Sequence, residues 1–201
     1  AGAQVLDLEE LAAHRGSVLG NLPERPQPSQ KWFESQLLAA LSSFDASRPV
    51  FVEGESKKIG QLQVPEALIA RMRAARCLRL EASLEVRVTL LLDEYRHFLA
   101  DRPLLEAQLD CLAALHGREE IAAWKTLAAQ GAWRDFVARL LMQHYDPAYR
   151  RSSLKNFTRL PDAETVCIES AEESTFARAA LQIGTDHVFP ISGKTWSVPV
   201  S

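Results

Sequence analysis

Cysteine is scarce in this chain, and long hydrophobic runs are missing. The three cysteines, Cys77, Cys111 and Cys167, lie far apart and form no C-x-x-C pair, which argues against a disulfide framework and a zinc knuckle. No apolar run approaches the roughly 20 residues that a membrane span needs. The first residues lack the charged and apolar regions of a signal peptide. These absences favour a protein of the reducing cytoplasm without a membrane segment.

An excess of one charge is also lacking. The 23 Lys and Arg residues nearly balance the 26 Asp and Glu residues, for a net charge of -3. Any contact with nucleic acid must therefore come from a local basic patch. Hydrophobic residues make up 47% of the 201 residues, an ordinary globular composition. At roughly 100 to 200 residues per domain, this length fits one generous domain, or one domain with an extension.

The common nucleotide-binding loops are absent as well. Neither G-x-x-x-x-G-K-[ST] nor G-x-G-x-x-G occurs in the sequence. No cysteine stands beside a histidine or at a helix start in the way that marks a nucleophile. The sequence therefore offers neither a phosphate-binding loop nor an evident nucleophile.

Short apolar runs alternate with helical spacings in the first part, and the second part is mainly helical. Ser29 is a good N-cap and Pro65 suits a first helical turn, whereas Asp146-Pro147 predicts a helix end. Strands are expected at residues 4–8, 50–52, 77–80 and 165–168, and loops at residues 14–17, 21–28 and 57–64. Helices are expected at residues 29–44, 65–72, 83–98, 103–115, 121–127, 133–145 and 171–182. This order predicts a mainly parallel α/β sheet with a helical bundle inserted before the last strand.

Acidic residues follow two of the expected strands. Asp7 and Glu9 come after the first, and Glu53 and Glu55 come after the second. Ligands of parallel sheets lie outside the carboxyl ends of the strands, and carboxylates there can hold a metal ion, orient a hydroxyl or act as a base. The alternative is that Glu9 and Glu10 only open a short helix and that Glu53 and Glu55 only form a polar turn.

Two further groups suit anionic ligands. His14-Arg15-Gly16-Ser17 combines a titratable ring, a guanidinium, a flexible glycine and a hydroxyl, and guanidinium groups match phosphate oxygens. An ordinary helix end explains the same pattern. Basic clusters with a nearby tyrosine, Tyr149, can meet nucleic-acid phosphates and bases, although a charge run is more often a solvated face. These clusters are Arg71, Arg73, Arg76 and Arg79; Arg150, Arg151 and Lys155; and Lys57 with Lys58.

Several of these motifs occur together in one known family. Val5-Leu6-Asp7-Leu8-Glu9, followed by His14-Arg15-Gly16-Ser17, resembles the D-L-E-G-L-A-x-H-R-G-S stretch of the tRNA 2-selenouridine synthases. The resemblance covers about residues 4 to 183. Further matches follow in the same order at similar spacing: Gln30 with Phe33-Glu34, Glu53-x-Glu55-Ser56-x-x-Ile59-Gly60, Leu62 to Pro65 with Arg71-Met72, Asp93-Glu94-Tyr95, Tyr145-Asp146-Pro147-x-Tyr149, and Val166 to Glu169.

This resemblance implies an enzyme of tRNA modification. Members replace the sulfur of wobble 2-thiouridine with selenium from selenophosphate, through an S-geranylated intermediate made with geranyl diphosphate. They carry a rhodanese-like domain with a catalytic cysteine, and then a P-loop-type domain whose Walker A loop lies just upstream of the D-L-E stretch. This sequence has neither the Walker A loop nor a match to that cysteine. We therefore expect it to be the larger part of the second domain, cut inside the enzyme, and inactive alone.

The resemblance also assigns roles to residues. It implies a catalytic edge of Asp7, Glu53 and Glu55 and no metal site, and it leaves a need for Mg²⁺ open. It implies ligand binding by His14, Arg15, Gly16, Ser17, Ser56 and Lys57, and tRNA contacts from Arg71, Arg73, Tyr149, Arg150 and Arg151. The implied fold is a P-loop-NTPase-like α/β sheet with a helical insertion, incomplete at its N-terminus. Its expected parts are residues 1–82, a tRNA-binding helical part at 83–160, a final strand and helix at 161–183, and a tail at 184–201.

Two other functions stay open at this point. A kinase-like P-loop phosphotransferase predicts tight ATP binding once upstream residues are restored. A non-catalytic helical RNA-binding module predicts tRNA binding that falls steeply with salt and needs neither Asp7 nor Glu53.

Overall fold

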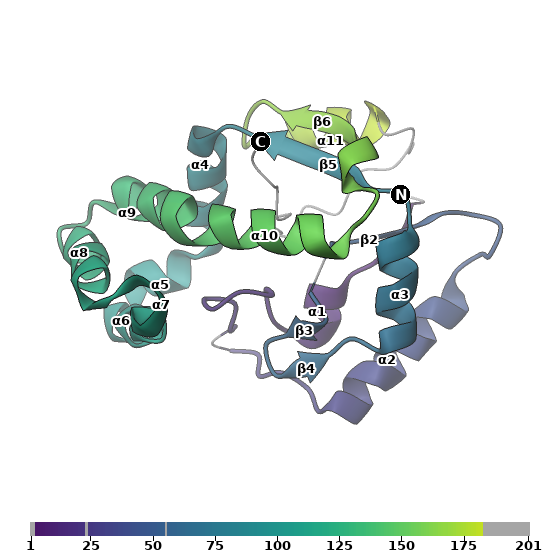
Figure 1. Ribbon diagram of the computed structural model, residues 1–201, viewed down its shortest axis with the longest axis horizontal. Helices are drawn as coiled ribbons and strands as arrows, with labels where there is room; N and C mark the ends of the chain where they lie inside the picture. The colour runs from purple at the N-terminus through teal and green to yellow at the C-terminus, as the bar shows by residue number, and fades with distance from the viewer. Residues whose placement is uncertain (1–2, 23, 55, 183–201) are drawn as a thin grey trace.

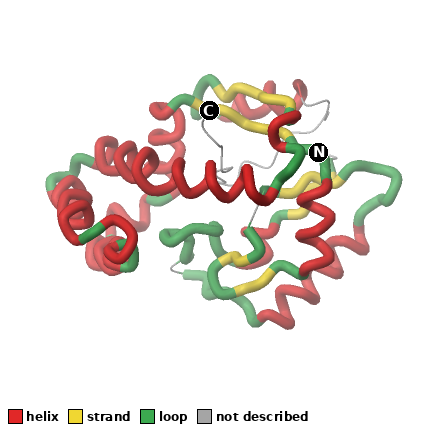
Figure 2. Tube along the Cα trace, in the orientation of Figure 1, coloured by secondary structure: helices red, strands yellow, loops and turns green. Residues whose placement is uncertain are grey.

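A computed structural model gives the structure of the protein and describes residues 3–182 except 23 and 55 (Figure 1). Helices make up most of it, and the strands are short (Figure 2). The expected tail at 184–201 lies outside the described residues. No described helix combines the length and the apolar composition that crossing a membrane requires.

The first parallel strand pair joins two segments that are more than 40 residues apart. β1 (Gln4–Leu6) pairs with β2 (Val50–Val52), with Leu6 opposite Val52. Between them lie α1 (Leu8–Ala12) and α2 (Gln30–Ser43). The expected N-cap of α2 is confirmed, because the Ser29 hydroxyl accepts from the Trp32 N–H at 3.3 Å.

Residues 57–64, expected as a loop, form a small hairpin instead. β3 (Lys58–Ile59) pairs antiparallel with β4 (Leu62–Gln63), and α3 (Glu66–Ala74) follows. Gly60 turns the chain with φ near +58°, a conformation that favours glycine. Ile59 and Leu62 both reach the core beside β1 and α2. Burial of this pair stabilises a hairpin whose strands are too short to be predicted from the sequence.

The second parallel pair forms across the helical insertion. β5 (Leu78–Ala82) pairs with β6 (Glu164–Ile168), and α11 (Glu173–Gln182) packs against β6. The predicted parallel pairing is therefore confirmed. The expected single sheet is not found among the described residues, which form three two-stranded sheets.

The helical part between β5 and β6 has its own core. Trp124 is fully buried in it, and its indole N–H donates to the Gln143 side-chain oxygen at 3.0 Å. The elements are α4 (Leu84–Glu94), α5 (Arg96–Ala100), α6 (Arg102–Asp110), α7 (Ala113–His116), α8 (Arg118–Ala129), α9 (Trp133–Leu140), the π-helix η1 (Leu141–Tyr145), α10 (Asp146–Asn156) and the 3₁₀ turn η2 (Leu160–Asp162).

The prediction that Asp146-Pro147 ends a helix is wrong. Pro147 lies in the first turn of α10, directly after the π-helix η1, whose i→i+5 spacing lets the helix continue past a residue that lacks an N–H. The π-helix η1 joins α9 to α10, so these three elements form one continuous helical segment across the molecule (Figure 1). Phe157, at the end of α10, packs against the core around β1 and α3. Tyr149 therefore lies inside a helix and is half-buried, not beyond a helix end.

Phe33 offers a test of the core around α2. It is fully buried, whereas its neighbour Trp32 is 59% exposed. We expect Phe33→Ala to lower the free energy of unfolding by about 3–5 kcal/mol, because a large cavity opens. Trp32→Ala, the matched control, should change it by only about 0.5 kcal/mol. Urea unfolding followed by circular dichroism measures both, and equal losses would contradict this core.

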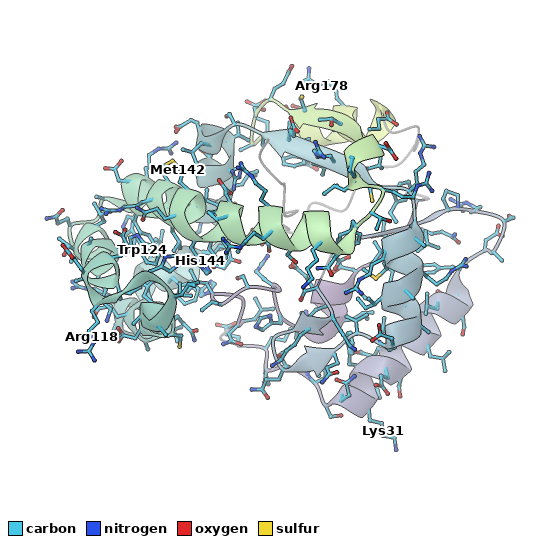
Figure 3. The ribbon with its side chains drawn as sticks, in the orientation of Figure 1. Lys31, Arg118, Trp124, Met142, His144 and Arg178 are labelled. Carbon is cyan, nitrogen blue, oxygen red and sulfur yellow. The ribbon has the colours of Figure 1, made fainter. Side chains whose placement is uncertain are left out.

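His144 makes the stability of the helical part depend on pH. It is buried in η1, and its Nδ1 lies 2.9 Å from Nε2 of His116 (Figure 3). Burial, with the nearby His116 and Arg151, lowers the pKa of His144 from 6.5 to about 4. The unfolded chain therefore binds this proton first as the pH falls, so stability is complete above pH 6.5 and declines from there towards pH 4.

We expect wild-type protein to lose about 2 kcal/mol more unfolding free energy than His144→Gln between pH 6.5 and pH 5. Met142→Gln, an exposed change in the same π-helix, should follow the wild-type pH profile. Chemical denaturation at both pH values measures the difference. A His144→Gln profile parallel to the wild type would rule out this assignment.

Candidate functional site

The two predicted catalytic strands end side by side. Because Leu6 lies opposite Val52 in parallel register, Asp7 and Glu53 both leave the sheet at its carboxyl edge. The Glu9 N–H donates to Oε1 of Glu53 at 2.8 Å. Glu53 is partly buried and is thus fixed against the start of α1. The expected meeting of the two strand ends at one edge is present.

Asp7 has a clear structural role at this edge. Its carboxylate accepts from the Glu10 N–H at 2.8 Å and caps α1. This is the role that an acid before a short helix would have without any catalytic function. Glu53 accepts from the Glu9 N–H of the same first turn, so both carboxylates hold the start of α1.

Gly54, Ser56 and Lys57, which follow Glu53 in the chain, lie at the surface. Glu55 lies outside the described residues. The Ser56 hydroxyl donates to the Lys58 carbonyl at 2.6 Å, and Lys57 forms an exposed ion pair with Glu66. Both side chains therefore hold the entry to the β3–β4 hairpin and α3.

The His14 ring is wedged between two glycines. It is 4% exposed, and its Nδ1 accepts from the Gly16 N–H at 3.1 Å. A Cβ added at Gly20 would lie 2.7 Å from Cε1 of the ring, and one added at Gly60 would lie 2.8 Å from Cδ2. Burial lowers the pKa of His14, so a neutral imidazole fits this space. It connects the loop at 14–20 to the β3–β4 hairpin.

Arg15 leaves the same loop in another direction. Its guanidinium forms an ion pair with Glu94 of α4, whose side chain is only 3% exposed. The guanidinium carbon also lies 5.7 Å from the centre of the Tyr95 ring, within the range of a cation–π contact. The predicted ligand group at 14–17 is therefore divided between the hairpin and the helical part.

Ser17 completes a small hydroxyl cluster beside Arg15. Its side chain lines the same cavity as Tyr95 and Tyr145, and its buried hydroxyl makes no hydrogen bond to either phenol. Burial raises the pKa of both phenols, so both hydroxyls stay neutral and remain able to donate hydrogen bonds. This cluster lies where the loop at 14–17 meets α4 and η1.

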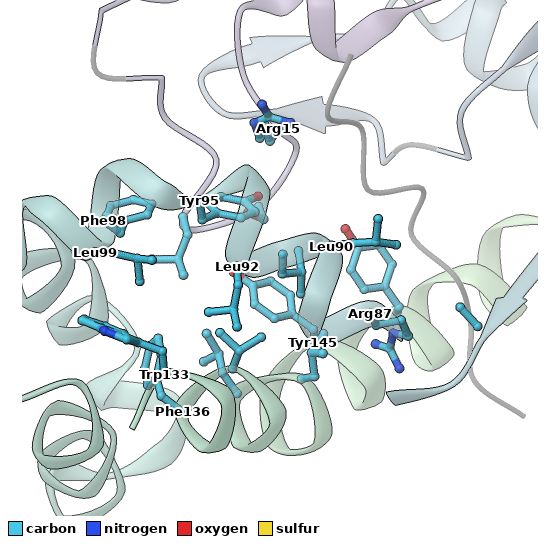
Figure 4. Close-up of a pocket in the computed structure, with 18 of the residues that line it drawn as sticks. Arg15, Arg87, Leu90, Leu92, Tyr95, Phe98, Leu99, Trp133, Phe136 and Tyr145 are labelled. Atoms are coloured by element: carbon cyan, nitrogen blue, oxygen red, sulfur yellow. The ribbon is translucent and has the colours of Figure 1, made fainter. Parts of the chain in front are cut away.

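A cavity of about 130 Å³ opens next to this cluster (Figure 4). Its walls come mainly from α4, α5, α9 and η1, with one side closed by β5, β6 and α11. Most of its lining is apolar, and the polar groups are Arg15, Ser17, Arg87 and the tyrosines. Arg87 pairs with Asp146 through both of its terminal nitrogens.

The predicted tRNA contacts occupy two separate helices. Arg71 is exposed and Arg73 half-buried on α3, while Arg150 and Arg151 are exposed on α10. Tyr149 instead faces the cavity, with its ring 6.5 Å from that of Tyr145. Among the described residues, no group of three or more His, Cys, Asp or Glu side chains is arranged to hold a metal ion.

Glu94, Arg87 and the cavity were not predicted as site features. Glu94 was expected only as part of the family motif Asp93-Glu94-Tyr95, because an acidic residue in a helix usually faces solvent. The signal was its position directly before a tyrosine on a helix rich in leucine. Only the tertiary pairing with Arg15 reveals its burial.

Comparison with known proteins gives one family. The family described as "tRNA 2-selenouridine synthase AAA domain" matches residues 2–108. A tRNA 2-selenouridine synthase of Marinobacter nauticus is 41% identical over 172 residues, covering 72% of this chain and 47% of the relative. One of Shewanella loihica is 36% identical over 175 residues, covering 73% and 47%. One of Shewanella halifaxensis is 45% identical over 96 residues, covering 47% and 26%.

The chain thus spans about half the length, or less, of these relatives. No solved structure matches it.

The packing around His14 can be tested through Gly20. A Cβ there would also lie 2.8 Å from the Ser17 carbonyl oxygen and 2.9 Å from its nitrogen, which are backbone atoms that cannot turn away. We expect Gly20→Ala to lower the unfolding free energy by about 1–3 kcal/mol. Gly54→Ala is the matched control, since its Cβ would meet only the Phe157 ring at 3.7 Å. Thermal unfolding compares the two variants, and a Gly20→Ala variant as stable as the wild type would contradict the packing of His14 against Gly20.

Proposed function

The chain belongs to the family of the tRNA 2-selenouridine synthase AAA domain, and on this basis we propose that it is part of an enzyme that converts wobble 2-thiouridine in tRNA to 2-selenouridine. The co-substrates are geranyl diphosphate and selenophosphate. The match over residues 2–108, which contain both carboxylates of the strand edge, carries the proposal. The reaction takes place in the cytoplasm, where tRNA is used.

The proposed reaction has two steps. First, the sulfur of thiouridine attacks the first carbon of the geranyl group, and the carbon–oxygen bond breaks with its electron pair passing to the diphosphate. Then the selenium of selenophosphate attacks the same carbon of the base, and geranyl thiolate leaves with the electron pair of the carbon–sulfur bond. Water cleaves the selenium–phosphorus bond, which releases phosphate and leaves 2-selenouridine. Alkylation makes the sulfur a better leaving group, which is why an S-geranylated intermediate helps the exchange.

Glu53 is the proposed acid–base residue of this chain, and Asp7 lies at the same strand edge. A catalytic role for Glu55 remains part of the proposal. The Glu53 carboxylate is positioned by the Glu9 N–H, so one oxygen is anchored and its orientation is set. Arg15 supplies a guanidinium for an anionic substrate, and Glu94 fixes its direction. His14, Gly16 and Ser17 hold this loop in place, and Ser56 and Lys57 flank the edge.

The tRNA surface is proposed on α3 and α10. Arg71, Arg150 and Arg151 are exposed there, and exposed guanidinium groups supply the salt-dependent part of RNA affinity. Tyr149 faces the cavity in this structure, which leaves the arginines as the main proposed contacts.

We further propose that the two parallel strand pairs belong to one P-loop-like sheet. β2 and β5 each have a single strand partner among the described residues. One additional parallel strand between them would join both pairs, and the loop after that strand would cradle phosphates at the edge that carries Asp7 and Glu53. The rhodanese-like domain of the same enzyme would supply the cysteine.

Glu53→Gln tests the enzyme function directly. We expect it to lower the rate of selenouridine formation at least 100-fold, because the amide keeps the Glu9 contact but cannot accept a proton. The assay uses a chimaera in which this chain replaces the matching segment of the Marinobacter nauticus protein, with thiouridine tRNA and both co-substrates. Glu24→Gln, an exposed change, should keep full activity.

Binding of tRNA is measured in parallel by filter retention. Loss of turnover with unchanged tRNA affinity supports the enzyme. Full turnover by Glu53→Gln would remove this residue from the mechanism. A chimaera that binds tRNA but never forms selenouridine would favour a non-catalytic RNA-binding module, and turnover by the isolated chain would overturn its proposed dependence on another domain.

A further inference from the structure

The cavity beside Arg15 has a mainly apolar lining, which suits an apolar ligand. Leu90, Leu91 and Leu92 of α4 line it although all three are only half-buried. Aromatic rings of Phe98, Trp133 and Phe136 complete the opposite walls (Figure 4). Apolar surface that remains open in this way gains free energy when a ligand covers it.

Charge in the cavity is balanced. Arg15 is paired with Glu94 and Arg87 with Asp146, so neither guanidinium leaves a net charge on the wall. A nucleobase is a poor guest, because its polar edges would lie among leucines with few partners. A hydrocarbon chain needs no such partners and matches the lining.

Four of the polar groups lie on one side of the cavity, whereas Arg87 lies away from Arg15 (Figure 4). The four are Arg15, Ser17, Tyr95 and Tyr145, and in Figure 4 Arg15 stands apart from the apolar walls, towards the strands. The structure therefore suits a ligand with two unlike ends. Its apolar part enters between α4 and α9, and its anionic part remains beside Arg15 and the tyrosine hydroxyls.

The size of the cavity agrees with a short chain. At about 130 Å³ it is close to the apolar cavity of about 150 Å³ that takes up benzene in another protein. It is open to one side, so a longer guest fills it and extends towards the polar groups.

We propose that this cavity binds the prenyl chain of the allylic diphosphate substrate, with the diphosphate on the Arg15 side. The assignment rests on the proposed function for the identity of the substrate, and it adds the place where the chain lies. The helical insertion then contributes the prenyl pocket, in addition to any tRNA surface. Sulfur attacks the first carbon at the mouth, and the diphosphate departs towards Arg15 with the electron pair of the broken bond.

Binding of thiolodiphosphate analogues tests this without turnover. Isothermal titration measures the affinity of the protein for geranyl and dimethylallyl thiolodiphosphate. We expect the geranyl analogue to bind at least 10-fold more tightly, because its additional five carbons are buried. Leu92→Trp fills the cavity and should abolish this preference. Leu115→Trp, the same substitution at a residue 62% exposed on α7, should retain it.

A second variant covers the case in which Leu92→Trp does not fold. Leu92→Ala enlarges the cavity and should raise the affinity for farnesyl relative to geranyl thiolodiphosphate at least 5-fold. An unchanged chain-length preference in both Leu92 variants would overturn the proposal that this cavity binds the prenyl chain. So would sedimentation showing that the wild type is a dimer which Leu92→Trp separates, because a second copy would then cover this surface.

The outcomes separate the two proposals. Normal tRNA binding and chimaera turnover, combined with a geranyl preference that Leu92 does not affect, would refute the pocket alone. A geranyl preference that depends on Leu92 in a protein that never modifies tRNA would refute the proposed function and leave an apolar-chain site.

Discussion

The buried ion pair between Arg15 and Glu94 is the contact on which the arrangement of the site depends. Removing both charges from water costs several kcal/mol, which only a close partner offsets. Glu94 is almost completely buried, so the loop at 14–17 must lie against α4 for the helical part to pack. The same contact turns His14 towards the β3–β4 hairpin and Ser17 towards Tyr95 and Tyr145. One pair thereby links the strand edge to the cavity.

Features with a local cause were predictable from the sequence. The Ser29 cap, the parallel strands and the shared edge of Asp7 and Glu53 follow from residue type, periodicity and strand direction, and the family resemblance is confirmed by the match over residues 2–108. Pro147 misled the prediction because the π-helix directly before it lets the helix continue past a residue that usually ends one. The hairpin at 58–63 was missed because two strands of two residues carry almost no periodic signal.

The rest of the site depends on tertiary packing that no local pattern encodes. His14 resembled a helix-end residue, and only the approach of Gly20 and Gly60 from distant segments explains its burial. The half-buried leucines of α4 resembled an ordinary amphipathic stripe, as a core helix and a pocket helix share the same spacing. What distinguishes them is whether a neighbouring element fills the facing space, and that is decided by α9 and η1, some 40 residues further along the chain.

The charge balance of the described residues also limits how the anionic substrate can be held. Arg15 is engaged by Glu94, Arg87 by Asp146 and Lys57 by Glu66. A diphosphate beside Arg15 would share that guanidinium with a buried carboxylate, and like charges at close range repel. Stable binding therefore needs further donors that carry no competing acid, such as backbone N–H groups of a glycine-rich loop. The paired cations fit the proposed phosphate loop at the edge of β2, and the part of the substrate proposed for this chain is then its apolar half.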